Sequence, residues 1–283
     1  MRVSLNITSY SWDGDTVDRL AEVARAADRG GIDTLWVNDH LMQAGPGTWP
    51  DEPMLEAYTA LGFLASQTRR VRLGTMVTGV TFRPAAVLIK AVTTVDVLSR
   101  GRAWLGIGAG YHLAEAEALG LPLPEQRQRF EILDETLALA RQMWAGDRTP
   151  FQGAHLRLAD PVASPLPVRR PPVLVGGMGE QRTLRLVARY ADACNLFDIP
   201  DGGQTLRHKL DVLRQRCDEA GRDYDSLDRT VSTRFDPSRP RAEFVAHCRE
   251  LASYGLTHVV CITNGPWHPD TVDALAEVAA ALA

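Results

Sequence analysis

Short β-branched runs alternate with longer amphipathic stretches from one end of the chain to the other, and this alternation limits the possible folds more than any other feature. The runs that read as strands are rich in valine, leucine, isoleucine and threonine. They occupy residues 3–7, 34–37, 71–77, 103–107, 173–175, 193–197, 230–233 and 259–263. Strands that alternate regularly with helices predict a parallel sheet with the helices packed outside it.

The amphipathic stretches between these runs read as helices. In residues 16–29 the apolar residues recur at helical spacing. We expect Asp15 to cap the start of this helix, and Gly30 with Gly31 to end it. The other predicted helices span residues 57–66, 84–98, 127–144, 181–190, 206–220, 242–254 and 271–282.

Eight strand–helix units in 283 residues predict one closed (β/α)8 TIM barrel that covers residues 1–283. The alternative is an open doubly wound sheet, which normally has a glycine fingerprint after its first strand. Here residues 8–12 read Thr-Ser-Tyr-Ser-Trp, so the α/β barrel is favoured. We expect an insertion after the fourth strand. An irregular, proline-rich segment at 146–170 precedes the fifth strand, with a short hairpin around residues 151–158.

The composition argues against several classes of partner. A formal net charge of −4 gives no indication of a nucleic-acid or anionic-membrane partner, and no apolar run approaches the length of a membrane span. The first residues alternate like a strand and lack a signal-peptide core, so we expect a cytoplasmic protein. The 4 cysteines and 7 histidines lack the paired spacing of a zinc site or redox motif. We therefore expect no metal.

The second predicted strand ends in Asn38, Asp39 and His40. In a barrel, functional groups gather where strands end and their loops begin. A carboxylate beside an imidazole can act there as acid, base or orienting pair. An alternative, in which Asp39 caps a turn and His40 bonds to the backbone, is about equally consistent with the sequence.

Glycines follow the fourth and fifth predicted strands. The Gly-x-Gly-x-Gly pattern at residues 106–110 would let a planar ring or a phosphate approach the backbone closely, although tight packing explains it nearly as well. The Gly-Gly-Met-Gly run at residues 176–179 precedes a helix, whose N–H donors suit an anionic phosphate. The lysine of a P-loop is absent, so a nucleoside triphosphate is not expected.

Taken in order, these strand ends resemble the luciferase-like superfamily, and within it the oxidoreductases that depend on the deazaflavin coenzyme F420. The resembling stretches are residues 36–41, 73–77 with 82–84, 98–110 and 175–179. The stretch at 98–110, Leu-Ser-Arg-Gly-Arg-Ala-Trp-Leu-Gly-Ile-Gly-Ala-Gly, is the most specific. The resemblance covers roughly the first two thirds of the chain, and the remainder fits by its strand–helix pattern alone.

The resemblance implies a hydride-transferring enzyme with F420 as its cofactor. It implies a bulge with a non-prolyl cis peptide at residues 75–77, behind the tricyclic ring, and places residues 109–110 near the polar edge of that ring. Residues 176–179 would hold the phosphate, and Asp39 and His40 would lie beside the reactive carbon and the substrate. The residues implied to bind the cofactor are Thr75, Met76, Val77, Ala109, Gly110, Gly176, Gly177, Met178 and Gly179.

One position departs from the family pattern. Sugar-phosphate dehydrogenases of this family place a glutamate directly after the strand-four glycine as proton donor, whereas this chain has Tyr111 and then His112. Glu115 lies one helical turn farther on. The resemblance therefore identifies neither the proton-transfer partner nor a sugar-phosphate substrate. We expect His40, oriented by Asp39, to move the proton, with Tyr111, His112 and Glu115 as further candidates.

Two alternatives remain open at this point. One is a monooxygenase of the same fold that uses reduced FMN, and the other is a non-catalytic barrel that binds flavin or acts through oligomer contacts. Trp12, Trp36 and Trp49 are candidates for the apolar wall of the pocket, with Trp36 at least equally suited to the core. The expected partner is a small-molecule substrate. By analogy with barrels that pair through helices at their side, we also expect a homodimer.

Overall fold

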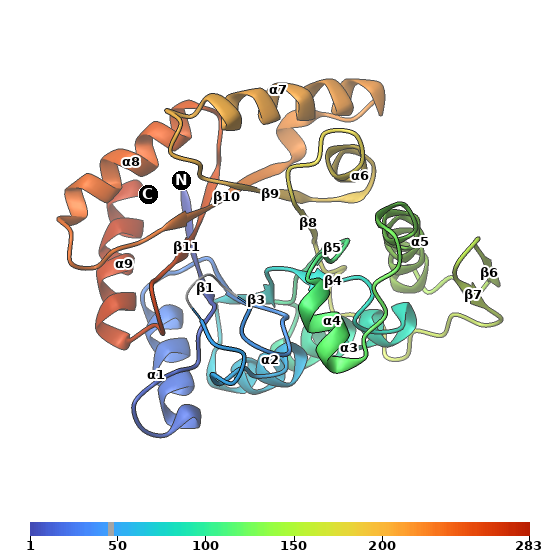
Figure 1. Cartoon of the computed structure of the whole chain (residues 1–283), viewed down its shortest axis with the longest axis horizontal. Helices are drawn as coiled ribbons and strands as arrows, with labels where there is room; N and C mark the ends of the chain where they lie inside the picture. The colour runs from blue at the N-terminus through green and yellow to red at the C-terminus, as the bar shows by residue number, and fades with distance from the viewer. Residues whose placement is uncertain (45–47) are drawn as a thin grey trace.

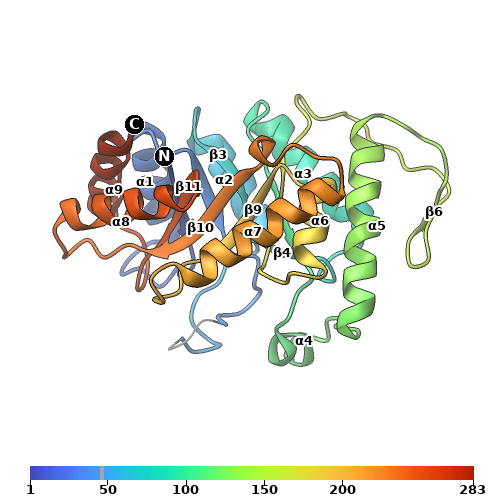
Figure 2. The same ribbon diagram turned by 90° about the horizontal axis from the view of Figure 1, so that it is seen from above.

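The computed structural model describes residues 1–44 and 48–283 and consists of a parallel sheet surrounded by helices (Figures 1 and 2). In the described residues the strands of this sheet follow the order β3-β2-β1-β11-β10-β9-β8-β5-β4. Their bounds are β1 Arg2–Ile7, β2 Thr34–Val37, β3 Arg72–Thr75, β4 Thr78–Gly79, β5 Leu105–Gly108, β8 Val173–Gly176, β9 Ala193–Phe197, β10 Asp228–Arg234 and β11 His258–Ile262.

The sheet closes into a barrel because β3 and β4 are two parts of one strand. β3 pairs with β2, while β4 pairs with β5. Near the other end of β3, a parallel bridge joins Leu73 to Ala103, and the N–H of Trp104 donates to the carbonyl oxygen of Leu73 at 2.8 Å. When β3 and β4 are counted together, the described barrel has eight strands. The predicted (β/α)8 fold is confirmed.

The eight predicted helices are all present, each within two residues of its predicted ends. Asp15 caps the first of them, because its side chain accepts hydrogen bonds from the N–H groups of Val17 and Asp18. The bounds are α1 Thr16–Arg29, α2 Ala57–Gln67, α3 Ala85–Ser99, α5 Gln126–Trp144, α6 Thr183–Tyr190, α7 Gln204–Glu219, α8 Arg241–Ser253 and α9 Pro269–Leu282. None of the described helices is long and apolar enough to cross a membrane.

Several short elements lie outside the eight strand–helix units of the barrel. The insertion after β5 contains a short helix, α4 (Leu113–Leu119), and the segment before β8 contains the hairpin β6 (Phe151–Gln152) and β7 (Arg157–Leu158). A 3-10 turn, η1 (Tyr224–Ser226), precedes β10. Figure 2 shows α4 projecting from one side of the barrel and both chain termini lying on the opposite side. The side of α4 is the one where the barrel strands end.

Two indole rings fill the middle of the barrel. Trp36 on β2 and Trp104 before β5 lie 5.6 Å apart between ring centroids, and both side chains are buried. Gly74 makes room for them, because a Cβ at this position would lie 2.7 Å from the Trp36 ring. The other buried members of this layer are Leu174, Ala193 and Val260. This packing closes the interior between the two ends of the barrel.

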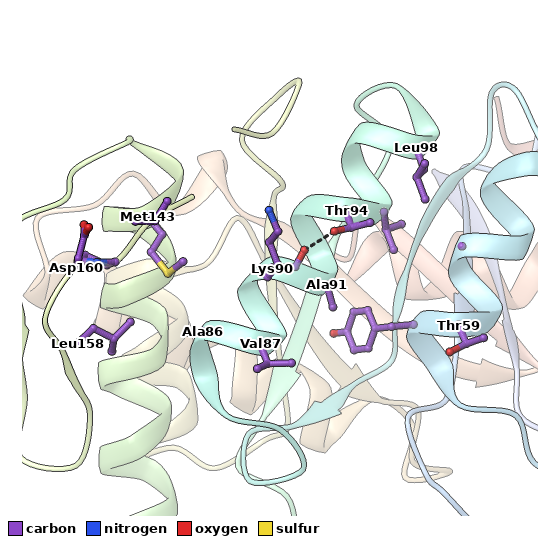
Figure 3. A pocket seen from close by; sticks show the side chains of 15 residues that line it. Thr59, Ala86, Val87, Lys90, Ala91, Thr94, Leu98, Met143, Leu158 and Asp160 are labelled. Atoms are coloured by element: carbon purple, nitrogen blue, oxygen red, sulfur yellow. Dashed lines mark hydrogen bonds between the residues drawn. The ribbon is translucent and has the colours of Figure 1, made fainter. Parts of the chain in front are cut away.

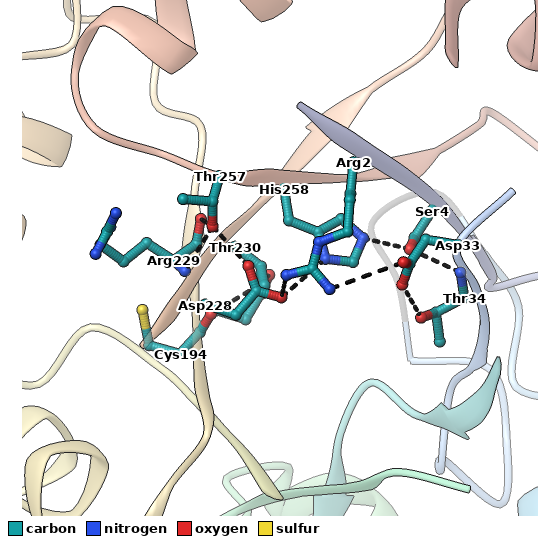
Figure 4. A network of polar contacts seen from close by, with 11 residues as sticks. Arg2, Ser4, Asp33, Thr34, Cys194, Asp228, Arg229, Thr230, Thr257 and His258 are labelled. Carbon is teal, nitrogen blue, oxygen red and sulfur yellow. Dashed lines mark hydrogen bonds and ion pairs between the residues drawn. The ribbon is translucent and has the colours of Figure 1, made fainter. Parts of the chain in front are cut away.

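A polar network crosses the barrel at the ends where the strands begin (Figure 4). Ser4 on β1 contacts His258 on β11 with 2.5 Å between Oγ and Nε2, and Asp228 on β10 contacts the same ring with 3.1 Å between Oδ2 and Nδ1. Arg2 donates to Asp228 at 2.5 Å. Ser4 and His258 are fully buried. The network thus joins three neighbouring strands, β1, β11 and β10, at the end of the barrel where the strands begin.

On the outside of the barrel, α2, α3 and the segment around β7 line a groove of about 680 Å³ (Figure 3). The α3 face that borders it carries Val87, Ala91, Thr94 and Leu98, which recur at helical spacing. Val87 is 55% exposed and Leu98 is 59% exposed. This groove is therefore an apolar surface on the side of the barrel, away from the strand ends.

Candidate active site

A cavity of about 680 Å³ opens where the barrel strands end. Its lining comes from the ends of all eight barrel strands, the segment after β5, the first turn of α5 and the start of α6. This volume lies within the usual range for small-molecule and cofactor sites, and the carboxyl end of the strands is where TIM barrels place their active sites. The cavity is therefore the candidate active site.

The floor of the cavity is built around the break between β3 and β4. The peptide bond between Met76 and Val77 is cis, within the bulge that the sequence predicts. The Val77 side chain fits between Gly108 and Gly176, where an added Cβ would lie 3.1 Å and 3.0 Å from its methyl groups. A Cβ on Gly106 would lie 1.8 Å from the Thr75 carbonyl oxygen. Within the 106–110 pattern, Gly106 and Gly108 thus serve the packing of the bulge, in agreement with the alternative interpretation of these two glycines.

His40 on the cavity rim is held by a buried carboxylate. Its Nδ1 lies 2.7 Å from Oε2 of Glu115, and Oε1 of Glu115 accepts the N–H of Leu41 at 2.6 Å. Burial raises the pKa of the Glu115 carboxyl, but the hydrogen bonds from His40 and Leu41 and the nearby imidazoles outweigh burial and lower it. Glu115 is therefore an anion that fixes the His40 ring, with Nδ1 as the bonded nitrogen.

The local sequence explains how Glu115 reaches His40. The α4 segment consists of leucine, alanine and glutamate, which are strong helix formers. His112 caps it by accepting the N–H of Glu115 on Nδ1 at 3.0 Å. Glu115 is buried on this short helix whereas Glu117 is exposed. The position directly after the strand-four glycine is Tyr111, and the nearby glutamate of this chain, Glu115, contacts His40 from the adjacent helix.

Asp39 does not orient His40, which corrects the prediction. Its two oxygens accept hydrogen bonds from the guanidinium of Arg83 at 2.6 and 2.8 Å, and Arg83 also pairs with Glu56. Burial raises the pKa of the Asp39 carboxyl, and Arg83 opposes this effect. A bidentate arginine–carboxylate pair is rigid and strong. Asp39 therefore anchors the loop after β4 to the end of β2.

Aromatic rings extend the His40 wall towards the opening. The rings of His40, Tyr111 and His112 lie 5.7–6.0 Å apart in edge-to-face arrangements. Tyr111 is 72% exposed, so its hydroxyl is at the mouth of the cavity and not at its floor. The T-shaped packing holds the imidazole of His40 from the solvent side.

The opposite wall carries a second histidine–carboxylate pair. Oδ2 of Asp198, after β9, lies 2.7 Å from Nε2 of His247 on α8 and accepts the hydroxyl of Thr233 at 2.6 Å. The hydrogen bond with Asp198 is the main cause that raises the pKa of His247. Asp198 and Thr233 line the cavity, and neither was predicted. Both lie in the last third of the chain, where the resemblance supplies no motif.

Two features of the rim suit an anionic group. Arg129 in the first turn of α5 donates through Nη1 to the Gly110 carbonyl oxygen at 2.7 Å, while its buried Nε has no partner among the described residues. Thr183 begins α6 and lines the cavity, and no side chain caps that helix. Helix N–H groups without a cap remain available to a ligand. Arg129 gives no sign of this role in the sequence, where it is one arginine among several on a helix.

The structure brings most of the predicted site residues to this cavity. Those that line it are Asp39, His40, Met76, Val77, Ala109, Gly110, Tyr111, His112, Gly176 and Gly177. Four predicted residues do not line it: Glu115 lies behind His40, Thr75 is buried with its hydroxyl donating to the Gly106 carbonyl oxygen, and Met178 and Gly179 lie farther along the loop.

None of the three tryptophans considered for the pocket lines it. Trp36 belongs to the middle layer of the barrel, as its alternative assignment allowed. Trp12 is buried and donates through Nε1 to the Trp267 carbonyl oxygen at 2.6 Å. Trp49 is 72% exposed. The apolar lining of the cavity comes instead from smaller side chains and phenylalanines, among them Met76, Val77, Phe82 and Phe130.

Comparison with protein families gives one match that spans nearly the whole chain. The family of luciferase-like monooxygenases matches residues 2–279. An F420-dependent glucose-6-phosphate dehydrogenase of Kineococcus radiotolerans is 32% identical over 246 residues, which cover 84% of this chain and 70% of the relative. A protein of the same name from Amycolatopsis mediterranei is 29% identical over 247 residues, covering 84% and 71%.

Solved structures with the same fold include enzymes of two kinds. An F420-dependent secondary alcohol dehydrogenase in complex with an F420–acetone adduct gives a TM-score of 0.86 at 18% identity, covering 100% of this chain and 99% of that one. A monooxygenase from Streptomyces bottropensis gives 0.80 at 18% identity, covering 98% and 97%. At these identities the likeness concerns the arrangement of the barrel and its surrounding helices.

Proposed function

From the premise that the chain belongs to the luciferase-like monooxygenase family, we propose that it is an F420-dependent oxidoreductase that transfers a hydride between the coenzyme and a small organic substrate. The names of the curated relatives support F420 as the cofactor. The observation that carries the proposal is the position of His40. Its ring is held by the buried Glu115 and lines the same cavity as the Met76–Val77 bulge.

The residues of the cavity fit a flat ring with an anionic tail. Val77, Gly108 and Gly176 form an apolar part of the cavity floor, and Phe82 and Phe130 add apolar surface. The uncapped start of α6 and the unpaired Nε of Arg129 are donors suited to phosphate and carbonyl oxygens, considering the described residues alone. When bound, F420 supplies the carbon that accepts or gives up the hydride.

His40 handles the proton that accompanies hydride transfer. Oxidation of a carbinol removes a hydride from carbon and a proton from oxygen, and both must leave for a carbonyl to form. With Nδ1 bonded to Glu115, His40 presents Nε2 as the free nitrogen, which accepts the hydroxyl proton while the Glu115 carboxylate stabilises the resulting imidazolium. In the reverse direction the same nitrogen returns the proton. Glu115 is thus a positioning residue.

Parallel titrations with F420 and FMN test the cofactor assignment. We expect the purified protein to bind F420 with micromolar or tighter affinity, followed by fluorescence, and to reduce it in the presence of a suitable alcohol. Micromolar affinity for FMN with none for F420 would favour the monooxygenase instead. Binding of F420 without turnover of any alcohol or carbonyl compound across a broad panel would favour a non-catalytic barrel.

We also propose a homodimer that forms through the outer face of α2 and α3. The exposed Val87 and Leu98 flank small residues along one stripe of α3, and the groove beside them offers apolar surface to a second copy. Sedimentation equilibrium tests this. We expect a dimer for the parent protein and a monomer for Val87→Glu/Leu98→Glu, whereas a monomeric parent would contradict the proposal.

We place the protein in the cytoplasm. Its four cysteines are all buried free thiols, which is typical of a reducing compartment. Cell fractionation tests this, because activity found outside the cytoplasmic fraction would contradict it.

A further inference from the structure

Asn6 places an amide group at the floor of the cavity. It lies on β1 at a position that faces the barrel axis, lines the cavity and is 4% exposed. A buried amide is costly unless its donor and acceptor are both satisfied. Its Nδ2 donates to Oδ1 of Asn38 at 3.1 Å, but its Oδ1 has no hydrogen-bond partner among the described residues. Among the described residues, this hydrogen-bond acceptor at the floor of the cavity therefore has no partner.

A second buried amide at the floor of the cavity, by contrast, has hydrogen-bond partners for both its oxygen and its nitrogen. Asn195 on β9 is 3% exposed and also lines the cavity. Its Oδ1 accepts the hydroxyl of Thr230 at 2.8 Å, and its Nδ2 donates to Oγ of Ser232 at 2.9 Å. The protein thus supplies partners for both groups of one amide, whereas the oxygen of the other, on a residue that lines the same cavity, has none among the described residues.

The open acceptor lies on the same wall as the proposed proton acceptor. Asn38, the partner of Asn6, is two residues before His40 at the end of β2. The other acceptors of this wall are already used, since Asp39 is bonded to Arg83 and Glu115 to His40. In the part of the chain that the structure describes, Asn6 and Arg129 are the cavity-lining residues with a buried unpaired polar atom, and that of Arg129 is a donor.

We propose that Asn6 determines substrate specificity, with its Oδ1 accepting a hydrogen bond from a second O–H or N–H group of the substrate. This rests on the proposed function, in which the reacting carbinol is bonded to His40. The substrate class it predicts is small diols and amino alcohols, in which a donor lies beside the reacting carbon. A site built to bond a donor rejects analogues without it far more strongly than an apolar pocket can, because the buried acceptor is otherwise left unpaired.

The test compares 2,3-butanediol with 2-butanol, which share one carbon skeleton and differ by one hydroxyl. With F420 saturating, we expect the parent enzyme to prefer the diol in kcat/KM by roughly 10²-fold or more. Asn6→Leu should reduce this ratio to about that of an apolar pocket, within roughly threefold of unity. Asn6→Asp, which keeps an acceptor, should retain the preference. Asn38→Leu is the matched control, because it removes the same amide pair but leaves Oδ1 of Asn6 in place.

Equal ratios in the parent and in Asn6→Leu would overturn the proposal, as would a parent enzyme that does not discriminate. A loss of F420 affinity in Asn6→Leu with an unchanged ratio would also overturn it, because the oxygen would then serve the cofactor. If neither alcohol is turned over, or if F420 does not bind, the dissociation constants of the two alcohols from ligand-observed NMR test the same preference at the level of binding, without the cofactor. Failure of F420 binding in the parent protein would therefore be seen separately from failure of the Asn6 proposal.

Discussion

The two ends of the barrel carry nearly the same pair of side chains in opposite settings. Where the strands end, Nδ1 of His40 lies 2.7 Å from Glu115, and where they begin, Nδ1 of His258 lies 3.1 Å from Asp228. Both carboxylates are almost fully buried. The His40 side chain, however, is 20% exposed and lines the cavity, whereas that of His258 is fully buried.

The two pairs therefore differ in access and not in residue type: the pair that we propose to be catalytic borders a cavity, whereas the other is enclosed. Ser4, His258 and Asp228 have the order of a nucleophile, a base and its orienting acid. Oγ of Ser4 also accepts the N–H of Thr34 at 3.1 Å, and neither of the two cavities described above is lined by these residues. At this end the same groups hold three strands together.

Exchanging each histidine for glutamine should produce opposite outcomes. For His40→Gln we expect kcat to fall about 10³-fold, because the proton acceptor is lost, with little change in the free energy of unfolding. For His258→Gln we expect the free energy of unfolding to fall by about 3 kcal/mol, since the partners of a buried charge network are left unpaired, with kcat of the folded protein retained. F420 reduction assays and urea titrations measure both. A similar loss of kcat in both variants would contradict the assignment of His40 to catalysis and of His258 to stability alone.

Glu115→Gln should impair catalysis without unfolding the protein. The amide cannot stabilise a positive imidazole and can present an N–H to Nδ1, which would reverse the tautomer of His40, so we expect kcat to fall by about 10²-fold. The matched control is Glu117→Gln, because Glu117 is exposed on the same helix. Steady-state kinetics decide the point, and equal rates in the two variants would mean that Glu115 does not act through His40.

Asp228→Asn should remove a pH-dependent part of the stability. Burial raises the pKa of Asp228, but its hydrogen bond with His258 and the charges of His258 and Arg2 lower it from 3.8 to about 2. A depressed pKa in the folded state stabilises the protein above the unfolded-state pKa, and this contribution is lost as the pH falls from about 4 to about 2. We expect Asp228→Asn to cost about 2 kcal/mol at pH 7 and much less near pH 2.

Urea titrations at several pH values measure this loss. The control is Asp211→Asn on the exposed face of α7, which should change stability little at any pH. A constant difference between the parent and Asp228→Asn from pH 7 to pH 2 would show that the charge of this carboxyl does not contribute.

Tyr111→Phe is expected to have the smallest effect. Because Tyr111 is 72% exposed and contacts His40 through the edge of its ring, phenylalanine keeps the packing and removes a hydroxyl at the cavity mouth. We expect kcat/KM to change by less than about threefold. A loss greater than tenfold would place the phenol in the proton transfer and extend the catalytic wall beyond His40.

The strand and helix pattern was predictable because it is local. The predicted bounds of the second and sixth barrel strands, 34–37 and 193–197, agree with β2 and β9. The predicted run at 71–77 is interrupted at Met76 and Val77, and that interruption was expected from the family resemblance and not from periodicity. The helix α4 was not predicted, because it has seven residues and begins with a histidine cap instead of the usual serine, threonine or aspartate.

The pairings within the site were not predictable, because they join residues far apart in sequence. Asp39 and His40 are adjacent, but their partners Arg83 and Glu115 lie 44 and 75 positions downstream of them. Adjacent residues at the end of a strand point in different directions, which periodicity of two already implies. One part of the polar interior does have a local signal: Ser4 and Asn6 are polar residues at alternate positions of β1, between Val3, Leu5 and Ile7.

The tilted, buried indoles of Trp36 and Trp104 have a consequence for the order of binding. They close the interior of the barrel midway, so among the described residues the coenzyme and the substrate are expected to enter the same cavity, where the strands end. A coenzyme that occupies the deeper part of this cavity would enter before the substrate and leave after it. We therefore expect ordered addition and release of the two reactants.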